Sequence, residues 1–324
     1  MSRLALSLLL GFCAASAAGA PARSSLREKP YGLLLLGEGG DRDWKEAVAA
    51  ITKELGKDLP LEFAAGSADE KAIQKSVDRL QAQRVKKLVV VPLFESSASD
   101  VMEEIRYLLG IRKDPSEGFF ANSRRGAQIV RRIQTRLPVV LTPALDDQPV
   151  VVEILTSRAL ALSRKSDGES LVILGQAPRS EAAAEQLAQT LNSLAERVRA
   201  KGGFLAGHAA LLEDDLGQSR RDKAAAKAKT LIQGLGRKTR VVVIAYNMTS
   251  SGAEKKVARA LSGVFMKFSG KGLLPDARLT KWVSESAEAG SRLPDMRVYK
   301  DAGRALNSSK TKEFKPKAFP GDRP

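Results

Sequence analysis

The sequence predicts an α/β protein made of two tandem doubly wound halves, each built on a parallel sheet. Short, uninterrupted apolar runs that suit buried parallel strands alternate with segments whose apolar residues recur every three or four positions, as in helices that face a core. The order of these segments in residues 30–165 returns in residues 168–300. We therefore expect two halves of similar architecture.

The first half opens with an apolar run at residues 31–37 that ends in glycine, which predicts a buried strand. The helix predicted after it stops at Gly56, and its apolar face consists of Trp44, Val48, Ile51 and Leu55. Further strands are predicted at residues 61–64, 87–94 and 137–142. Further helices are predicted around residues 73–80, from Val101 onward, and at 149–163.

The second half repeats this order. Strands are predicted at residues 171–175, 203–206 and 240–246, with helices around 187–198 and 218–234. Residues 82–99 and 234–252 each contain a basic run, a β-branched strand and a loop rich in hydroxyl groups. We interpret this as an internal duplication with a period of about 140 residues.

The two ends of the chain carry their own signals. Arg3, a short apolar run at residues 4–12 and small residues at 15–20 are typical of a secretory signal peptide, which we place at residues 1–22. Export to the periplasm or the extracellular space follows. A lipoprotein anchored through Cys13 is the less favoured alternative, because bulky Phe12 precedes that cysteine. Residues 307–324, rich in lysine and proline, are predicted to form a disordered basic tail.

Composition narrows the classes of function. The chain has 53 Lys and Arg against 37 Asp and Glu, a formal net charge of +16, which favours anionic partners such as polycarboxylates or an acidic envelope component. Aromatic residues are only 5% and do not alternate with basic ones, which disfavours nucleic acid. The one cysteine lies in the predicted signal peptide, so disulfides, thiolate metal sites and a cysteine nucleophile are not expected. No apolar run is long enough to predict a transmembrane segment.

In a doubly wound sheet, ligands bind beyond the carboxyl ends of the strands. Three segments near such strand ends resemble the CbiX-type sirohydrochlorin chelatases: LLLLGEGGDRD at 33–43, VVVPLFESSASDVMEEI at 89–105 and TPALDDQPVVVEIL at 142–155. The resemblance implies a class II chelatase fold over about residues 30 to 290. It also implies an enzyme, a lyase, that inserts Co²⁺ or Fe²⁺ into a carboxylate-rich tetrapyrrole held between the halves, as in cobalamin biosynthesis.

The resemblance also assigns site residues. The two histidines that the family uses fall on Glu38 and Asp100 of this sequence, while the second half offers Gln176 and the region of Ala253. Carboxylates can ligate metal ions and accept pyrrole protons, so Glu38 and Asp100 are the candidate catalytic residues. Together with Glu95 they are also the candidate metal ligands.

Candidate substrate-binding residues lie in the same loops and in a basic stretch. They are Ser96, Ser97, Arg124 and Arg125. Bidentate arginines suit the carboxylates of a tetrapyrrole, although a basic stretch is usually a solvated face.

Structural alternatives stay open for several of these residues. Glu38 can be a solvated loop residue and Asp100 the N-cap of the helix from Val101. His208, the sole histidine, is either a structural residue or a group that reaches the crevice, and Trp282 is expected to pack a helix.

Two functions from different classes follow. The first is a divergent CbiX-type protein that binds a divalent metal, a tetrapyrrole, or both, and that inserts the metal if it is active. The second is a catalytically inactive envelope protein that binds or scaffolds an anionic partner on the same fold. The replaced histidines motivate the second.

Overall fold

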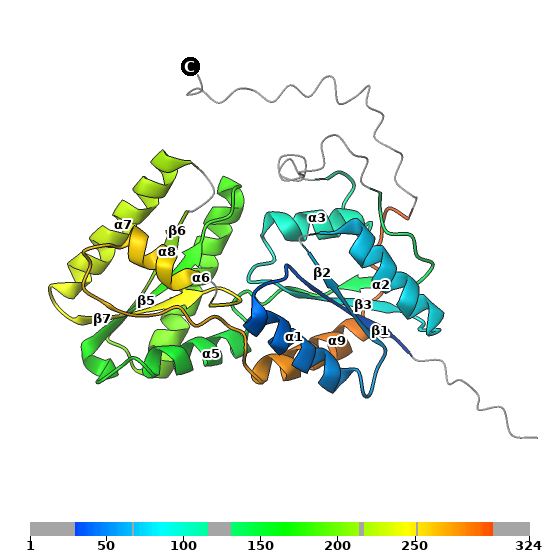
Figure 1. Cartoon of the computed structure of the whole chain (residues 1–324), viewed down its shortest axis with the longest axis horizontal. Helices are drawn as coiled ribbons and strands as arrows, with labels where there is room; N and C mark the ends of the chain where they lie inside the picture. Colours follow the sequence, from blue (N-terminus) through cyan, green and yellow to red (C-terminus); the bar gives the residue numbers. More distant parts are fainter. Residues whose placement is uncertain (1–29, 67, 116–130, 214–216, 251, 301–324) are drawn as a thin grey trace, which may run out of the picture.

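The computed structural model describes residues 30–66, 68–115, 131–213, 217–250 and 252–300. They form two four-stranded parallel sheets, ordered β2-β1-β3-β4 and β6-β5-β7-β8 (Figure 1). The strands of the first sheet are β1 (Gly32–Gly37), β2 (Leu61–Ala65), β3 (Leu88–Leu93) and β4 (Val139–Leu141). Those of the second are β5 (Glu169–Gln176), β6 (Ala206–Leu212), β7 (Arg240–Tyr246) and β8 (Lys267–Ser269).

Helices cover both faces of each sheet. Those in the first half of the sequence are α1 (Arg42–Leu55), α2 (Glu70–Ala82), α3 (Asp100–Leu108) and α5 (Pro149–Leu160). Those in the second half are α6 (Glu181–Gly202), α7 (Gln218–Gly236), α8 (Ala253–Ala260) and α9 (Arg278–Ser291). A short 3₁₀ turn, Ser166–Gly168, precedes β5. The predicted α/β class with two doubly wound halves is confirmed.

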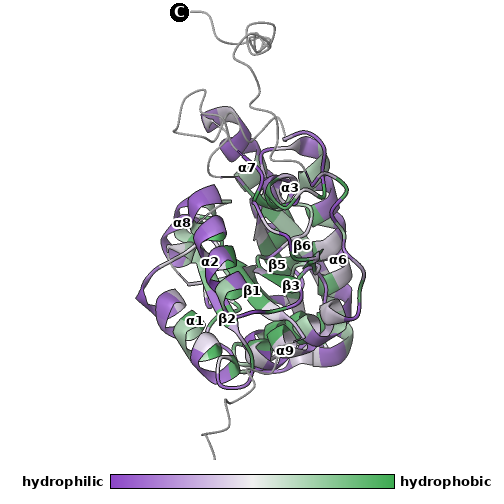
Figure 2. Ribbon diagram, turned by 90° about the vertical axis from the view of Figure 1, so that its right-hand side faces the viewer, coloured by the Kyte–Doolittle hydropathy of each residue, from purple (hydrophilic) through white to green (hydrophobic). Residues whose placement is uncertain are grey.

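The central strands are apolar along their whole length because both of their faces are buried. In β1, Leu33 and Leu35 contribute to the core that contains α1, while Leu34 and Leu36 face α2 and α3. All four side chains are at most 2% exposed. Figure 2 shows the corresponding contrast between apolar strands and the polar outer surfaces of α1, α2 and α8. Continuous apolar runs thus predicted these strands correctly.

Each sheet is covered on one face by a helix from the other half of the sequence. The last helix, α9, packs against β3 and β4 of the first sheet beside α1 (Figure 1). Conversely, α5 packs against α6 and β7 of the second half. One hydrophobic core therefore runs through both halves, whereas α2 with α3 and α7 with α8 cover two smaller, separate cores.

The predicted halves at 30–165 and 168–300 meet at the turn that leads into β5. Packing does not follow that limit, because α5 and α9 each cross it. Trp282, which was expected to pack a helix, lies in α9 with 8% of its surface exposed. Both sheets have the same strand order, but the duplication itself stays a prediction.

One strand prediction was wrong in position. The strand expected at residues 203–206 is β6, Ala206–Leu212. Gly203 instead ends α6 in the left-handed conformation at φ 68°, which glycine adopts without steric cost. The predicted signal peptide (1–22), the tail (307–324), and Arg124 and Arg125 all lie outside the described residues. No helix within the described ranges has the length and apolar character needed to cross a membrane.

Candidate functional site: a carboxylate pair in the cleft between the halves

The first wall of the cleft is built where β1 and β3 end. The two strands are hydrogen-bonded neighbours in which Gly37 pairs with Leu93. The loops that follow therefore start side by side and carry Glu38 and Glu95 toward each other. Gly37 is required at its position, since a Cβ there would lie 2.8 Å from the Trp44 indole that packs over the turn.

The pair of carboxyl groups is electrostatically coupled. Burial, followed by the negative charge of Glu38, raises the pKa of Glu95 to about 7. The backbone N–H of Met248, from the second half, donates a 2.7 Å hydrogen bond to Glu95 Oε1 and partly opposes this shift. Burial also raises the pKa of Glu38, although its side chain is open to the cleft. With a pKa of about 7, the Glu95 carboxyl group is partly protonated near neutral pH.

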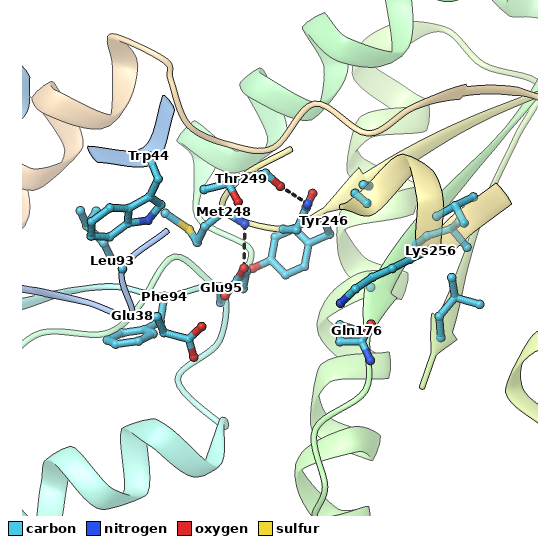
Figure 3. A pocket seen from close by; sticks show the side chains of 18 residues that line it. Glu38, Trp44, Leu93, Phe94, Glu95, Gln176, Tyr246, Met248, Thr249 and Lys256 are labelled. Atoms are coloured by element: carbon cyan, nitrogen blue, oxygen red, sulfur yellow. Dashed lines mark hydrogen bonds between the residues drawn. The ribbon is translucent and has the colours of Figure 1, made fainter. Parts of the chain in front are cut away.

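The second wall is formed by the ends of β5 and β7 and by α8. Gln176 is the last residue of β5, Tyr246 ends the neighbouring strand β7, and Lys256 projects from α8. In Figure 3, Glu38 and Glu95 lie on one side of the cleft and Gln176 and Lys256 on the other. The cleft encloses a cavity of about 280 Å³ that is lined by residues of both halves.

Hydrogen bonds from Tyr246 connect the second wall to the first. Its hydroxyl donates a 2.9 Å hydrogen bond to the carbonyl oxygen of Asp146 and also lies within hydrogen-bonding distance of the Glu95 carbonyl. Burial, followed by the charge of Glu95, raises the Tyr246 pKa well above its usual value, so the phenol remains a donor. The backbone that carries Glu95 is therefore anchored to the second half.

Residues 32–162 match the family model CbiX. This match covers the first half of the chain and supports a CbiX-type class II chelatase fold there. Among solved structures, SirB from Bacillus subtilis with Fe³⁺ is similar at 12% identity and a TM-score of 0.56, with 81% of this chain and 96% of that chain covered. At this identity the likeness shows a shared chelatase-like fold.

A second solved structure is a multi-domain protein from Deinococcus radiodurans that is described as structurally similar to chelatases. It is 17% identical with a TM-score of 0.49, and the match covers 81% of this chain and 55% of that chain. No curated protein sequence matches the chain.

The CbiX-type resemblance predicted Asp100 as a partner of Glu38, but Asp100 is not among the described residues that line the cavity. Asp100 is the first residue of α3, and the N-cap of that helix is Ser99, whose Oγ accepts a hydrogen bond from the Met102 N–H at 3.3 Å. The N-cap assignment of Asp100 was therefore wrong by one residue. The charge of Asp100 acts on Glu104, one turn along α3, rather than on the Glu38–Glu95 pair.

The expected CbiX-type metal site of Glu38, Asp100 and Glu95 is not assembled. Across the described ranges, no three or more His, Cys, Asp or Glu side chains are grouped in a way that could hold a metal ion. Of the three predicted ligands, the structure brings Glu38 and Glu95 together. A metal ion in this cleft would have to take its remaining ligands from solvent or from the bound molecule.

The two predicted substrate-binding serines hold the loop of this domain together. Ser97 Oγ donates to Asp146 Oδ2 at 2.6 Å and accepts from the Ala144 N–H at 2.8 Å. The hydroxyl of buried Ser96 accepts from the Ala98 N–H at 3.1 Å. Neither serine is among the described residues that line the cavity. Both act on the site by positioning the segment that carries Glu95.

His208 does not reach the cleft. It is the third residue of β6, near the end of that strand that faces away from the ligand-binding edge, and it is not among the described lining residues. Arg132, part of the basic stretch considered for substrate steering, is 7% exposed and stacks between the rings of Tyr107 and Tyr299, each 5.1 Å away. Its role in the described structure is to pack the first half.

Sequence reasoning missed Tyr246 and Lys256. Tyr246 was predictable from the sequence. It is the last residue of the apolar run RVVVIAY, and residues at the carboxyl ends of such strands line the cleft of a doubly wound sheet. Lys256 was not predictable, because it lies among other basic residues of α8 and its direction depends on where that helix begins.

Proposed function

We propose that this CbiX-type chelatase-like protein binds a divalent metal ion, Co²⁺ or Fe²⁺, a carboxylate-rich tetrapyrrole, or both, in the cleft between its halves. The observation that carries the proposal is the Glu38–Glu95 pair, held at the ends of β1 and β3 and facing the second half. Its position matches the edge where ligands of doubly wound sheets bind.

The pair can take part in metal insertion as a proton acceptor. Each divalent ion that enters a tetrapyrrole displaces two pyrrole protons. Because the pKa of Glu95 is about 7, its ionised fraction near neutral pH can accept one of the two at a carboxylate oxygen. The second proton passes to solvent, to which Glu38 is open. Attraction of a cation to the same carboxylates would bring the metal to the place where these protons are released.

The alternative is a protein that binds an anionic component of the envelope without catalysis. The observation that favours it is the lack of a three-ligand metal cluster within the described part of the chain. Under this alternative the cleft binds its ligand, but the carboxylate pair contributes no metal affinity and no acceleration of insertion.

Titration calorimetry with Co²⁺ and anaerobic Fe²⁺, followed by absorbance spectroscopy of sirohydrochlorin with each metal, separates the two functions. We expect Glu38→Gln and Glu95→Gln each to weaken metal binding and slow metal insertion by at least tenfold. Glu54→Gln, which alters an exposed carboxylate on α1, is the matched control. Unchanged metal binding and insertion in the Glu38→Gln/Glu95→Gln double variant would contradict the proposal.

We further propose that the protein acts outside the cytoplasm, on the basis of the signal-like segment at residues 1–22. N-terminal sequencing of the protein recovered from its native host tests this. A mature terminus between residues 17 and 23 is expected, and an intact Met1 would contradict export.

A further inference from the structure

A second cavity adjoins the cleft in the second half, between α7 and α8. It has a volume of about 410 Å³. Its basic lining residues are Arg221 and Lys229 from α7 and Lys256 and Arg259 from α8. Arg221, Ala225 and Lys229 recur every four positions and so lie on one face of α7, where the small alanine leaves room between the two long cations. We call this cavity the α7–α8 groove.

The groove has more positive than negative charge. Two acids line it, Glu213 and Asp222, against four cations. Glu213 already accepts a 3.1 Å hydrogen bond from Arg220 Nε, and Asp222 accepts from the Gln218 amide at 2.9 Å. The acids therefore do not neutralise the lining cations one for one, and the groove favours an anion.

The hydrogen bonds of Arg221 also indicate that the groove favours an anion. Its Nη2 donates to Gln218 Oε1 at 2.8 Å, whereas its Nε is buried and has no hydrogen-bond partner in the described part of the chain. A buried donor without an acceptor is costly. A ligand carboxylate is the planar acceptor that a guanidinium group binds best.

The groove is continuous with the cleft. Leu212 and Lys256 line both cavities, and Lys256 extends toward Gln176 at the cleft wall (Figure 3). The first-half wall carries the carboxylates Glu38 and Glu95, which repel other anions. A ligand that brings carboxylates into the cleft therefore finds a favourable environment for them on the second-half side.

From this arrangement we propose that the α7–α8 groove is a polycarboxylate-binding subsite that holds the acidic arms of the molecule bound in the central cleft. The assignment of the arms to that molecule rests on the proposed function, while the affinity of the groove for carboxylates does not. The two sides of the site would then have different roles. Glu38 and Glu95 would exchange protons and cations on the first-half side. Lys229, Lys256 and Arg259 would bind carboxylates on the second-half side.

The test compares two double variants of the full mature chain that remove the same charge from the same helices. Lys229→Met/Arg259→Gln alters the groove, whereas Lys223→Met/Lys255→Gln alters exposed residues that are not among the described groove lining. The probes are uroporphyrin, which is rich in carboxylates, deuteroporphyrin, which has few, and citrate alone. Binding is followed by porphyrin fluorescence and by calorimetry, with circular dichroism as the check of folding.

We expect the groove variant to bind uroporphyrin at least tenfold more weakly and citrate measurably more weakly, with little change for deuteroporphyrin. Added salt should weaken uroporphyrin binding more in the wild type than in the groove variant. The control variant should match the wild type. An equal loss in both variants would show a general effect of net charge and overturn the subsite.

The outcomes also separate the subsite from the proposed function. If uroporphyrin binds equally well to the wild type and the groove variant, the subsite is wrong and binding in the cleft stands. If no porphyrin binds but citrate binding depends on Lys229 and Arg259, the carboxylate site stands and the proposed function is wrong. If neither porphyrin nor citrate binds the wild type, both are wrong.

Discussion

Helix α9 packs so closely on the first sheet that a single methyl group at Gly290 should destabilise the protein. A Cβ at this position would lie 2.8 Å from Val89 Cγ1 in β3 and 3.0 Å from Thr142 Cγ2 just after β4, and both residues are buried. Overpacking of this kind costs about 1–3 kcal/mol. The higher helix propensity of alanine returns up to about 1 kcal/mol. We expect Gly290→Ala to lower the free energy of unfolding by up to about 2 kcal/mol.

The chain offers a matched control in Gly234, which also lies near the C-terminal end of a helix, α7, and would place its Cβ with nothing in the described structure within 4 Å. Gly234→Ala should therefore stabilise by up to about 1 kcal/mol. Urea denaturation of both variants, followed by circular dichroism, measures whether each substitution lowers or raises the free energy of unfolding. If Gly290→Ala proves as stabilising as Gly234→Ala, the close contact between α9 and β3 is refuted.

Two further predictions concern pH, with opposite signs. Burial, then the charge of Asp100, raises the pKa of Glu104 to about 7, so its stabilising contribution is complete below about pH 4.5 and is lost as pH rises to 7. At about 1.4 kcal/mol per pKa unit, Glu104→Gln should gain up to about 3 kcal/mol over the wild type between pH 5 and pH 8, and a pH-independent difference in urea denaturation would contradict this. For Asp295, burial alone would raise the pKa, but hydrogen bonds from Arg297, the Val139 N–H and Lys300 outweigh it and lower the pKa strongly. Asp295→Asn should therefore cost about 1–3 kcal/mol at pH 7, and this cost should shrink as pH falls below about 4, which equilibrium unfolding at pH 7 and pH 3 would show.

The central strands were predictable because burial on both faces leaves an uninterrupted apolar run, as in β1 and β3. Edge strand β6 was misplaced because most of it is only half-buried, and its sequence, AGHAALL, mixes small and polar residues. The packing partner of α9 was not predictable. Its apolar residues, such as Leu279 and Val283, show that one face is buried, but either sheet could have buried it.

The candidate site was predictable only on its first wall. Glu38 and Glu95 follow apolar strands directly, and neighbouring parallel strands place such residues together. Asp100 does not line the described cavity, because five further positions and the Ser99 cap carry it onto α3. The second wall depends on tertiary geometry, since the N–H of Met248 and the side chain of Lys256 meet the cleft only when the two halves are packed.

Because α9 lies near the end of the sequence, the first sheet is synthesised well before the helix that packs on it. The first sheet is complete at Leu141, but the helix that covers part of β3 and β4 begins at Arg278. A ribosome needs on the order of ten seconds to add the chain between these points. During that interval the part of the sheet's apolar face that α9 covers, over β3 and β4, has no native cover, so a chain truncated before α9 should be captured by chaperones or aggregate rather than leave a folded first half.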